Sequence, residues 1–496
     1  MAKEDVVIIG SGLGGLSAAV MLAREGKRVL VVERQRVVGG CLQSFRRGRH
    51  LLDTGIHYVG ALADGAILNQ YFRYLGVMDR LRLARLDDEG FDCIHLADGS
   101  SYLHAAGYDR FVETLARDFP RERAGLEAFC ARMREVGELI SPEVLRSGRL
   151  SAGGLEYMSL SAVGELERCI GDEKLRQVLA GSVPLYAVKR ETASFYIHAM
   201  INHSNIEGAY SFVGGTQQLA DLLVEELRRH GGEIRTSAEV TRIHLNGDCV
   251  EWVELNGEER IETASVISSI HPCHTFSLLD NNQVIKRAFY SRLQTLENSY
   301  GIFTVYLTFK KDTVRYENRN HYIYNTEDVW SLEGKFGGLD IPWVLFSMQA
   351  SDSPYCEVAT LLVPMQLKEL ERWLETKSGH RGADYEAFKA RFAEQIIELV
   401  HQRIPHLKPA IEKVYTASPL TYRDYTGTPD GSAYGIVKDF HNPIVNHLPA
   451  RTRIRNLLLT GQSLNVHGAL GVVVSSAVTC SELLGVEYLA KKIGNA

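Results

Sequence analysis

The chain opens on Val6-Val-Ile-Ile-Gly10-Ser-Gly12-Leu-Gly-Gly15, and this stretch decides the fold. Four apolar residues, typical of a buried parallel strand, lead into Gly-x-Gly-x-x-Gly, and a helix is expected over 17–25. In such a unit the first glycine makes a tight turn, the second lets the backbone approach a pyrophosphate, and the third lets the helix pack against the strands. The pattern predicts a dinucleotide site that includes Gly10, Ser11, Gly12, Leu13, Gly14 and Gly15.

A second apolar strand is expected over 28–33, and it ends on an acid. Glu33 lies 18 residues after Gly15, where its carboxylate can accept hydrogen bonds from ribose hydroxyls. The Gly39-Gly40 pair that follows is typical of FAD proteins and lets the backbone pass beside a pyrophosphate. No second strand–glycine motif–helix unit occurs in the sequence, which argues against an additional NAD(P)H domain. We therefore predict FAD as the cofactor, with Glu33, Arg34, Gly39 and Gly40 at its site.

Residues 456–481 contain no Asp, Glu, Lys or Arg, which raises the question of whether the segment forms a transmembrane helix. Its first half holds Gln462, Asn465 and His467, which a spanning helix would not tolerate. We predict instead a buried strand over 457–460, a glycine-rich loop and a buried helix from about Gly468. The amino terminus of that helix can stabilise negative charge on a reduced flavin. The FAD site is predicted to include Gly461, Gln462, Gly471 and Val472.

The middle of the chain contains a further strand–helix unit. An amphipathic helix is expected from Gly214 to Arg229, followed by strands at 233–235 and from Val240, a predicted FAD-site residue. Asn256-Gly257 favours a type I′ hairpin turn between 250–255 and 260–263. A separate buried strand is expected over 265–270, returning to the first sheet.

The remaining stretches differ in their pattern of expected helices and strands, and this difference predicts a second domain. Residues 61–205 have mostly helical patterns, and 290–415 mix strands at 302–309, 343–348 and 357–364 with a helix at 384–403. The predicted fold class is α/β, with a discontinuous Rossmann-type FAD-binding domain and a mixed α+β substrate domain. The FAD-binding domain is assigned to 1–60, 206–289 and 416–496, and the substrate domain to 61–205 and 290–415.

Composition excludes several classes of protein. The 496 residues carry 55 Lys and Arg against 61 Asp and Glu, so no basic excess favours nucleic-acid binding. No two of the eight cysteines lie closer than 24 residues, which argues against a redox pair or zinc-ribbon spacing, and we predict no metal. Free thiols and the lack of a leader pattern predict a cytoplasmic protein.

At these motifs the sequence resembles the FAD-dependent phytoene desaturase, carotenoid isomerase and retinol saturase superfamily of amine-oxidase-like flavoproteins. Asp53-Thr-Gly-Ile-His-Tyr58 and Thr460-Gly-Gln462 are most similar to the retinol saturase branch. Most of the superfamily has Arg where this chain has Cys41, a departure that is also reminiscent of that branch. The matching stretches are 6–15, 33–45, 52–60, 119–122, 212–215, 418–427, 431–435 and 459–476.

The resemblance implies chemistry on C=C bonds of a conjugated polyene, with a hydride moving between carbon and flavin N5. Reduction is the favoured direction; desaturation, cis–trans isomerisation and amine oxidation by the same fold stay open. The resemblance also places Gly55 and Ile56 near the flavin ring. Reduction needs a proton donor close to the second carbon. The candidates are His57 and Tyr58, then Tyr210, His203 and Tyr434; each is alternatively a packed core side chain.

The resemblance further implies an apolar small-molecule substrate and an external electron donor. Such a substrate must leave a membrane or a carrier, so we expect peripheral membrane contact through apolar surface within 140–190, with 157–160 and 183–188 as candidates. A non-enzymatic alternative exists, because Rab GDP-dissociation inhibitors share the architecture and bind prenylated proteins without FAD. The intact Gly15, Glu33 and Gly39-Gly40 argue against that alternative.

Overall fold

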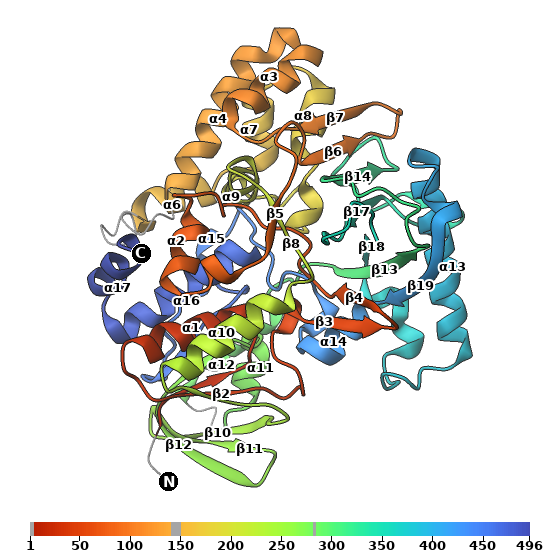
Figure 1. The fold of residues 1–496 in the computed structure, drawn as a ribbon. Helices are drawn as coiled ribbons and strands as arrows, with labels where there is room; N and C mark the ends of the chain where they lie inside the picture. Colours follow the sequence, from red (N-terminus) through yellow and green to blue (C-terminus); the bar gives the residue numbers. More distant parts are fainter. Residues whose placement is uncertain (1–3, 140–149, 281–283) are drawn as a thin grey trace.

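Two sheets, one largely parallel and one largely antiparallel, organise the chain (Figure 1). The computed structural model describes residues 4–139, 150–280 and 284–496. The first sheet has the order β10-β11-β12-β1-β2-β9, and β20 pairs with β12. Its strands are β1 (Glu4–Ile9), β2 (Val29–Val32), β9 (Glu233–Arg235), β10 (Val240–Asn246), β11 (Cys249–Leu255), β12 (Glu259–Ser268) and β20 (Leu457–Leu459).

The predicted Rossmann unit is present at the centre of the first sheet. β1 pairs in parallel with both β2 and β12, and its residues from Val6 to Ile9 are buried. α1 (Leu13–Arg24) is buried along nearly its whole length, because it packs against α10 (Gln217–Arg229) and α16 (Gly468–Leu484). The helix begins four residues before the predicted start, since Gly12 already serves as its extended N-cap residue.

β12 differs from the sequence prediction, which expected two separate strands. The Asn256-Gly257 turn is confirmed, with positive φ at both residues, and the start of β12 pairs antiparallel with β11. The same strand then continues without a break and pairs in parallel with β1 from Thr263 to Ser268. One strand therefore joins the hairpin to the Rossmann sheet: burial alternates along its first half and is continuous from Val266 to Ser268, as expected where a strand enters a sheet covered on both faces.

The second sheet has the order β19-β13-β18-β17-β14-β6-β7. Its β6 and β7 lie in the range predicted to be mostly helical, and the sequence analysis missed them. Both strands are short, and β6 is stabilised by parallel pairing with β14, a partner more than 200 residues away in the chain. The strands are β6 (Asp92–His95), β7 (Ser101–His104), β13 (Gly301–Phe309), β14 (Asn320–Tyr324), β17 (Trp343–Met348), β18 (Val358–Met365) and β19 (Ile411–Ala417).

Helices cover the second sheet on both sides (Figure 1). α13 (Ala383–Arg403) lies along its outer face, and its buried residues share a core with β13, β17 and β18. A helical layer extends from the other end of this sheet, and one core cluster joins it to the α1 region. Its helices are α3 (Tyr108–Asp118), α4 (Arg123–Glu138), α7 (Ala162–Cys169), α8 (Glu173–Ala180) and α9 (Phe195–Ile206).

The expected membrane-facing stretch is only partly described. Residues 140–149 lie outside the described part of the chain. Val183, Tyr186 and Val188 are buried and Leu185 is half-buried, so 183–188 belongs largely to the core. Among the described helices, none combines the length and the apolar character needed to cross a bilayer.

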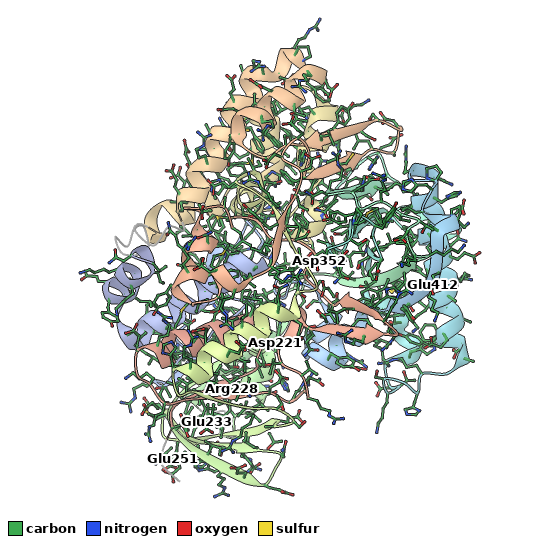
Figure 2. All side chains as sticks on the ribbon, viewed as in Figure 1. Asp221, Arg228, Glu233, Glu251, Asp352 and Glu412 are labelled. Atoms are coloured by element: carbon green, nitrogen blue, oxygen red, sulfur yellow. The ribbon has the colours of Figure 1, made fainter. Side chains whose placement is uncertain are left out.

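Exposed charged side chains lie on strands of both sheets, on the helix α10 and on connecting loops (Figure 2). The labelled exposed examples are Asp221, Arg228, Glu233, Glu251, Asp352 and Glu412. The apolar interior is thereby confined to the layers between the sheets and the helices, and the site opens between those layers.

Candidate active site

A cavity of about 240 Å³ opens at the carboxyl ends of β1 and β2, where the two sheets meet. Ligands of open parallel sheets bind at this edge. Residues from both chain ends and from the middle line it together. The lining residues that the sequence analysis assigned to the FAD site are Gly10, Ser11, Gly12, Leu13, Gly14, Glu33, Arg34, Gly39, Gly40, Gly55, Ile56, Val240, Gly461, Gln462 and Val472.

The glycine turn leaves room for a phosphate group. A Cβ atom added to Gly12 would meet no atom within 4 Å, so this backbone faces open space in the cavity. α1 begins directly after Gly12 and has no side-chain cap. The unpaired N–H groups of a helix amino terminus and its positive dipole end favour an anion. The turn therefore fits the pyrophosphate of a dinucleotide.

Gly15 and Gly471 stand behind the cavity wall and do not line it. A Cβ at Gly15 would lie 2.0 Å from the carbonyl oxygen of Gly10, and one at Gly471 would lie 2.4 Å from that of Val466. Both positions need glycine because backbone segments touch there. Both glycines let the helices pack closely, which is the role that the motif predicts for Gly15; the assignment of both to the FAD site stays a prediction.

Glu33 occupies the end of β2 at the cavity and is 8% exposed. Its Oε2 accepts hydrogen bonds from the Ser11 amide (2.9 Å) and hydroxyl (2.6 Å), and its Oε1 accepts one from the Gln35 amide (2.8 Å). The carboxylate is thus fixed between the glycine turn and the second strand. This is the place where a ribose hydroxyl of a dinucleotide is bound in such folds.

A second helix amino terminus faces the same cavity. α16 begins at Gly468, and Gly468, Ala469 and Val472 line the cavity. Its N-cap residue, His467, makes no capping hydrogen bond, and burial lowers the pKa of its imidazole to about 4. The ring is therefore neutral at physiological pH, and the helix dipole is the positive element at this end.

The cavity wall formed by the second sheet is apolar and aromatic. Ile302 on β13 and Leu362 on β18 line it together with Tyr422 and Tyr434. Tyr422 lies on α14 (Pro419–Thr426), and its hydroxyl donates to the Thr54 carbonyl at 2.8 Å. Tyr434 is held by its amide, which donates to the Ser299 hydroxyl (2.9 Å), and its ring lies 4.7 Å from that of His467.

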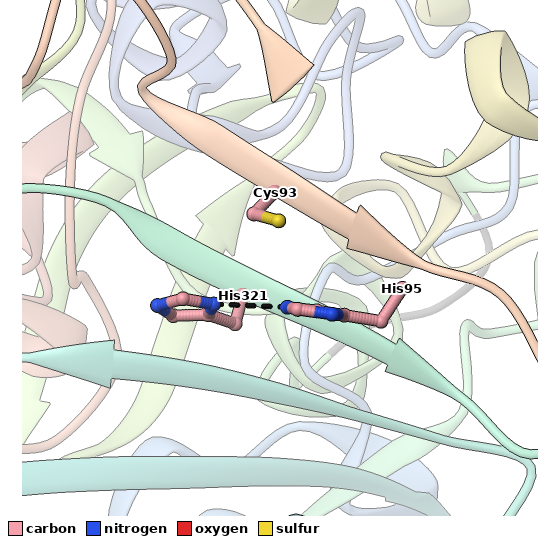
Figure 3. A group of neighbouring side chains, drawn as sticks. All are labelled: Cys93, His95 and His321. Carbon is pink, nitrogen blue, oxygen red and sulfur yellow. Dashed lines mark hydrogen bonds between the residues drawn. The ribbon is translucent and has the colours of Figure 1, made fainter. Parts of the chain in front are cut away.

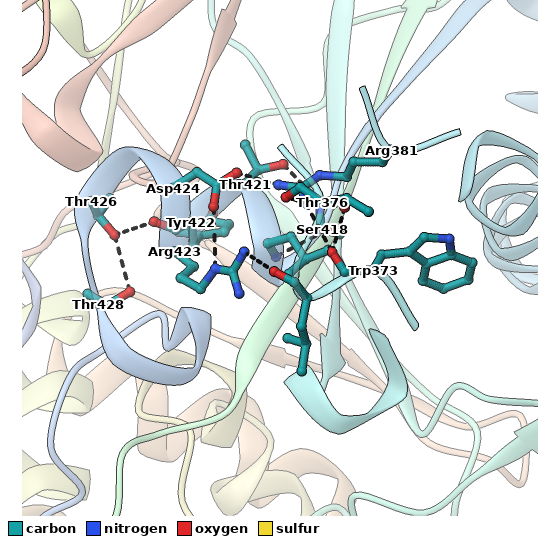
Figure 4. A network of polar contacts seen from close by, with 12 residues as sticks. Trp373, Thr376, Arg381, Ser418, Thr421, Tyr422, Arg423, Asp424, Thr426 and Thr428 are labelled. Carbon is teal, nitrogen blue, oxygen red and sulfur yellow. Dashed lines mark hydrogen bonds and ion pairs between the residues drawn. The ribbon is translucent and has the colours of Figure 1, made fainter. Parts of the chain in front are cut away.

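A polar network fixes α14 from the side away from the cavity (Figure 4). Arg381 is 8% exposed, forms an ion pair with Asp424 and donates to the Thr376 carbonyl at 2.7 Å. The adjacent Arg423 donates to the Leu374 carbonyl at 2.9 Å, which anchors the same turn of the helix. Tyr422 is therefore presented by a rigidly held element.

Four of the five sequence-predicted proton donors, His57, Tyr58, Tyr210 and His203, do not line the larger cavity. His57 borders a second cavity of about 10 Å³, room for a single water, and burial lowers its pKa to about 4. Its Nε2 finds no hydrogen-bond partner among the described residues. Tyr210, on the short β8 (Tyr210–Phe212), is half-buried beside Arg85. His203 is buried and hydrogen-bonded to Tyr108 (2.8 Å). Of these candidates only Tyr434 lines the larger cavity.

Tyr58 belongs to a buried network that no local sequence pattern indicates. Its hydroxyl donates to Asp92 at 3.0 Å and is hydrogen-bonded to the Tyr322 hydroxyl at 2.5 Å. Asp92 also accepts from the Asn320 side chain (2.9 Å). Burial raises the pKa of Asp92 to about 7, so this acid carries a proton far above the usual range. Asp92 escaped the sequence analysis because its strand, β6, was not predicted.

Lys438 is a second buried ionisable residue that the sequence analysis missed. It is 2% exposed, and its Nζ donates to the carbonyls of Asn446 (2.7 Å), Ser463 (2.8 Å) and Leu464 (2.9 Å). Burial lowers its pKa to about 7. Because Ser463 lines the cavity, this lysine holds the loop between β20 and α16 in place.

Comparisons with known proteins agree with this geometry. The chain is 28% identical to human all-trans-retinol 13,14-reductase over 97% of its own length and 85% of that protein. It is 25% identical to carrot chloroplastic prolycopene isomerase, covering 87% of this chain and 72% of that one. The structure of cyclohexylamine oxidase from Brevibacterium oxydans superimposes with a TM-score of 0.62 at 16% identity, over 97% of this chain and all of that one.

The family model for flavin-containing amine oxidoreductases matches residues 13–362, well over half of the chain. Its members are flavoproteins, and the glycine turn, Glu33 and the two helix amino termini at one cavity suit FAD. The retinol-reductase and prolycopene-isomerase relatives agree with the branch indicated by the sequence motifs. The chain therefore belongs to the flavin-containing amine oxidoreductase family, as an oxidoreductase whose cofactor is FAD.

Proposed function

We propose that this enzyme reduces a C=C bond in an apolar, conjugated substrate by hydride transfer from FAD. The observation that carries the proposal is the apolar and aromatic wall formed by Ile302, Leu362, Tyr422 and Tyr434. Two carboxylates line the cavity. Glu33 follows β2 and Glu239 precedes β10, so both lie at the end of the cavity that holds the dinucleotide motif. An apolar wall suits a polyene better than a charged amine. The similarity to all-trans-retinol 13,14-reductase supports the same choice.

The cavity-lining residues that the sequence predicts for the FAD site would hold FAD. When bound, FAD supplies or accepts the hydride. The amino termini of α1 and α16 would favour its pyrophosphate and any negative charge on its ring. Glu33 would bind the ribose, and the close-packed glycine turn would fix the cofactor's path. The apolar wall excludes water from the reacting end, which strengthens each of these electrostatic contacts.

Tyr434 is the proton donor that the geometry favours. Its ring lines the cavity, whereas Tyr58 and His57 lie behind the lining. Its hydroxyl carries a proton at physiological pH, as a tyrosine ordinarily does, and burial raises its pKa further, which makes it a weaker acid than an exposed tyrosine. A donor within hydrogen-bond reach of the second carbon completes the addition of two hydrogens. Tyr58 and protonated Asp92 lie behind the cavity lining, where they would hold the neighbouring side chains in position and provide a proton to replace the one that is donated.

The proposal extends to the division into domains and to the other partners of the enzyme. We retain the FAD-binding domain at 1–60, 206–289 and 416–496 and the substrate domain at 61–205 and 290–415. The substrate class implies an external electron donor. Peripheral membrane contact from a cytoplasmic position remains a prediction, with 157–160 as its described candidate: Tyr157 and Leu160 are half-buried.

An anaerobic reaction tests the function. The purified yellow protein is reduced with dithionite and mixed with retinol, carotenoids or aryl polyenes, while flavin reoxidation and product mass are followed. Reduction predicts flavin reoxidation together with a product two hydrogens heavier than the substrate. A product of unchanged mass would replace the proposal with isomerisation, and aerobic turnover of amines alone would replace it with amine oxidation. Tyr434→Phe is the matched variant, because it should bind FAD normally and turn over slowly.

A further inference from the structure

A cluster of metal-ligating side chains lies on the second sheet, away from the FAD cavity (Figure 3). β6 and β14 run in parallel, with Cys93 directly opposite His321. Because side chains alternate along a strand, Cys93, His95 and His321 share one face of the sheet. Asp92, Asn320 and Tyr322 share the other face, where they join the Tyr58 network. None of the three cluster residues lines the FAD cavity.

The three ligand atoms converge on one point. The Sγ of Cys93 and a ring nitrogen of each histidine all lie within 4.8 Å of one another. His95 Nε2 and His321 Nδ1 are 3.0 Å apart, and Figure 3 shows these nitrogens facing each other. Zinc–nitrogen bonds of about 2.0–2.1 Å at a tetrahedral angle place two nitrogens about 3.3 Å apart. The histidines therefore need to separate by only a few tenths of an ångström to admit an ion.

The outward-facing nitrogens of both rings are already held by polar partners. His321 Nε2 lies 3.1 Å from Glu317 Oε2, and His95 Nδ1 lies 2.8 Å from the Ser101 hydroxyl. Histidines that bind a metal usually donate their second N–H to a carboxylate or another oxygen, which fixes the ring and its tautomer. Such partners leave His95 Nε2 and His321 Nδ1 as the nitrogens that face the centre.

We propose that Cys93, His95 and His321 bind a zinc-class divalent ion as a three-ligand site whose fourth position is open to water. One thiolate and two imidazoles form a borderline-soft donor set, which suits zinc better than magnesium or calcium. On binding, the Cys93 thiol releases its proton to solvent, and His95 moves its ring proton from Nε2 to Nδ1, where Ser101 accepts it. The thiolate and the Glu317 carboxylate then balance the two positive charges of the ion.

Access and neighbouring charges are compatible with such a site. Cys93 and His321 are buried, whereas His95 is half-buried and gives a route from solvent. The nearby guanidinium groups are occupied elsewhere: Arg403 donates to the Leu96 carbonyl (3.0 Å), and Arg319 pairs with Asp87 (2.5 Å). The alternative is an ion-free histidine pair. It accounts for the 3.0 Å contact and for the Glu317 hydrogen bond, but it gives no role to the thiol.

The test uses the FAD-loaded protein without an affinity tag, dialysed against a chelator and then against excess zinc chloride. Elemental analysis should find one zinc per chain after free metal is removed. X-ray absorption at the zinc edge, which FAD does not affect, should show one sulfur near 2.3 Å together with nitrogen near 2.0–2.1 Å. Zinc should also raise the thermal unfolding midpoint, since a ligand that binds only the folded state stabilises it.

Cys93→Ser and His95→Gln are the site variants, and Cys249→Ser is the matched control because its half-buried thiol lies on β11 of the other sheet. Both site variants should keep their FAD absorbance, lose stoichiometric zinc and lose the zinc-dependent thermal shift, while the control behaves as wild type. The proposal is overturned if wild type retains no zinc. It is equally overturned if the zinc spectrum contains no sulfur, or if the two site variants bind as much zinc as the control.

Discussion

The two ends of the FAD cavity are built in different ways. The dinucleotide end is centred on one short stretch, Gly10 to Gly40, whose glycine turns and Glu33 line the cavity. The aromatic end collects Ile302, Leu362 and Tyr434 from three separated segments. Backbone recognition tolerates few changes, because a side chain at the wrong place strikes the chain itself. The aromatic end depends on side chains, which can change chemistry while the fold persists.

The largest expected effect is at the dinucleotide end. Gly15→Ala places a Cβ 2.0 Å from the Gly10 carbonyl oxygen, and a backbone atom cannot move aside as a flexible side chain can. We expect a loss of about 3 kcal/mol or more in the free energy of unfolding, and loss of bound FAD. Denaturant titration and flavin absorbance measure the two effects.

Gly12→Ala is the control for this comparison. Its Cβ would meet no protein atom within 4 Å, so the free energy of unfolding should stay within about 0.5 kcal/mol of wild type. FAD affinity should still fall, because the new methyl group occupies the space assigned to the pyrophosphate. Equal destabilisation by both substitutions would contradict the separate roles given to these glycines.

Removal of the Lys438 amine tests what holds the cavity loop. Lys438→Met leaves the buried carbonyls of Asn446, Ser463 and Leu464 without their donor. Unpaired buried polar groups are costly, and we expect a loss of about 3 kcal/mol in stability. Thermal and denaturant unfolding measure it, with the exposed Lys413→Met as control. An unchanged midpoint would mean that the loop packs without this clamp.

Tyr434→Phe tests the aromatic end without touching the dinucleotide end. The substitution keeps the ring and removes only the hydroxyl proposed to donate the proton. General acids contribute roughly 100-fold or more to a rate, so the turnover number should fall by about 100-fold. FAD content and the unfolding midpoint should not change. Full activity in this variant would move the donor role to another group.

The smallest predicted effect concerns pH. Because burial raises the folded-state pKa of Asp92 to about 7 from an ordinary value of 3.8, the folded protein holds a proton that the unfolded chain releases. Its contribution to stability is therefore full below pH 3.8 and is lost as pH rises through 7. Relative to Asp92→Asn, wild type should lose on the order of 2 kcal/mol between pH 5 and 8. Parallel pH profiles for the two proteins would refute the raised pKa.

The dinucleotide end of the site could be predicted from the sequence, whereas the aromatic end and the buried ionisable residues could not. Gly10 to Gly15, Glu33 and Gly39-Gly40 form a local pattern, and each residue type is dictated by backbone geometry or by ribose chemistry. Gly15 packs against backbone as the motif predicts, whereas no local pattern indicates that Gly471 also stands where two backbone segments touch, because a glycine pattern does not distinguish close packing from ligand contact. Asp92 and Lys438 carry no local signal, since an isolated charged residue is usually solvated.

The sequence by itself determined the Rossmann unit, the Asn256-Gly257 hairpin and the flavin family, because these depend on contacts between residues close in the chain and on stereotyped backbone turns. Tertiary structure alone decided that β6 joins β14, that β12 bridges hairpin and sheet, and that Tyr434 rather than Tyr58 lines the cavity. It also brought Cys93 and His95 to His321. These contacts depend on pairing between strands that are distant in the chain, and a local pattern of residues does not predict which strands will pair.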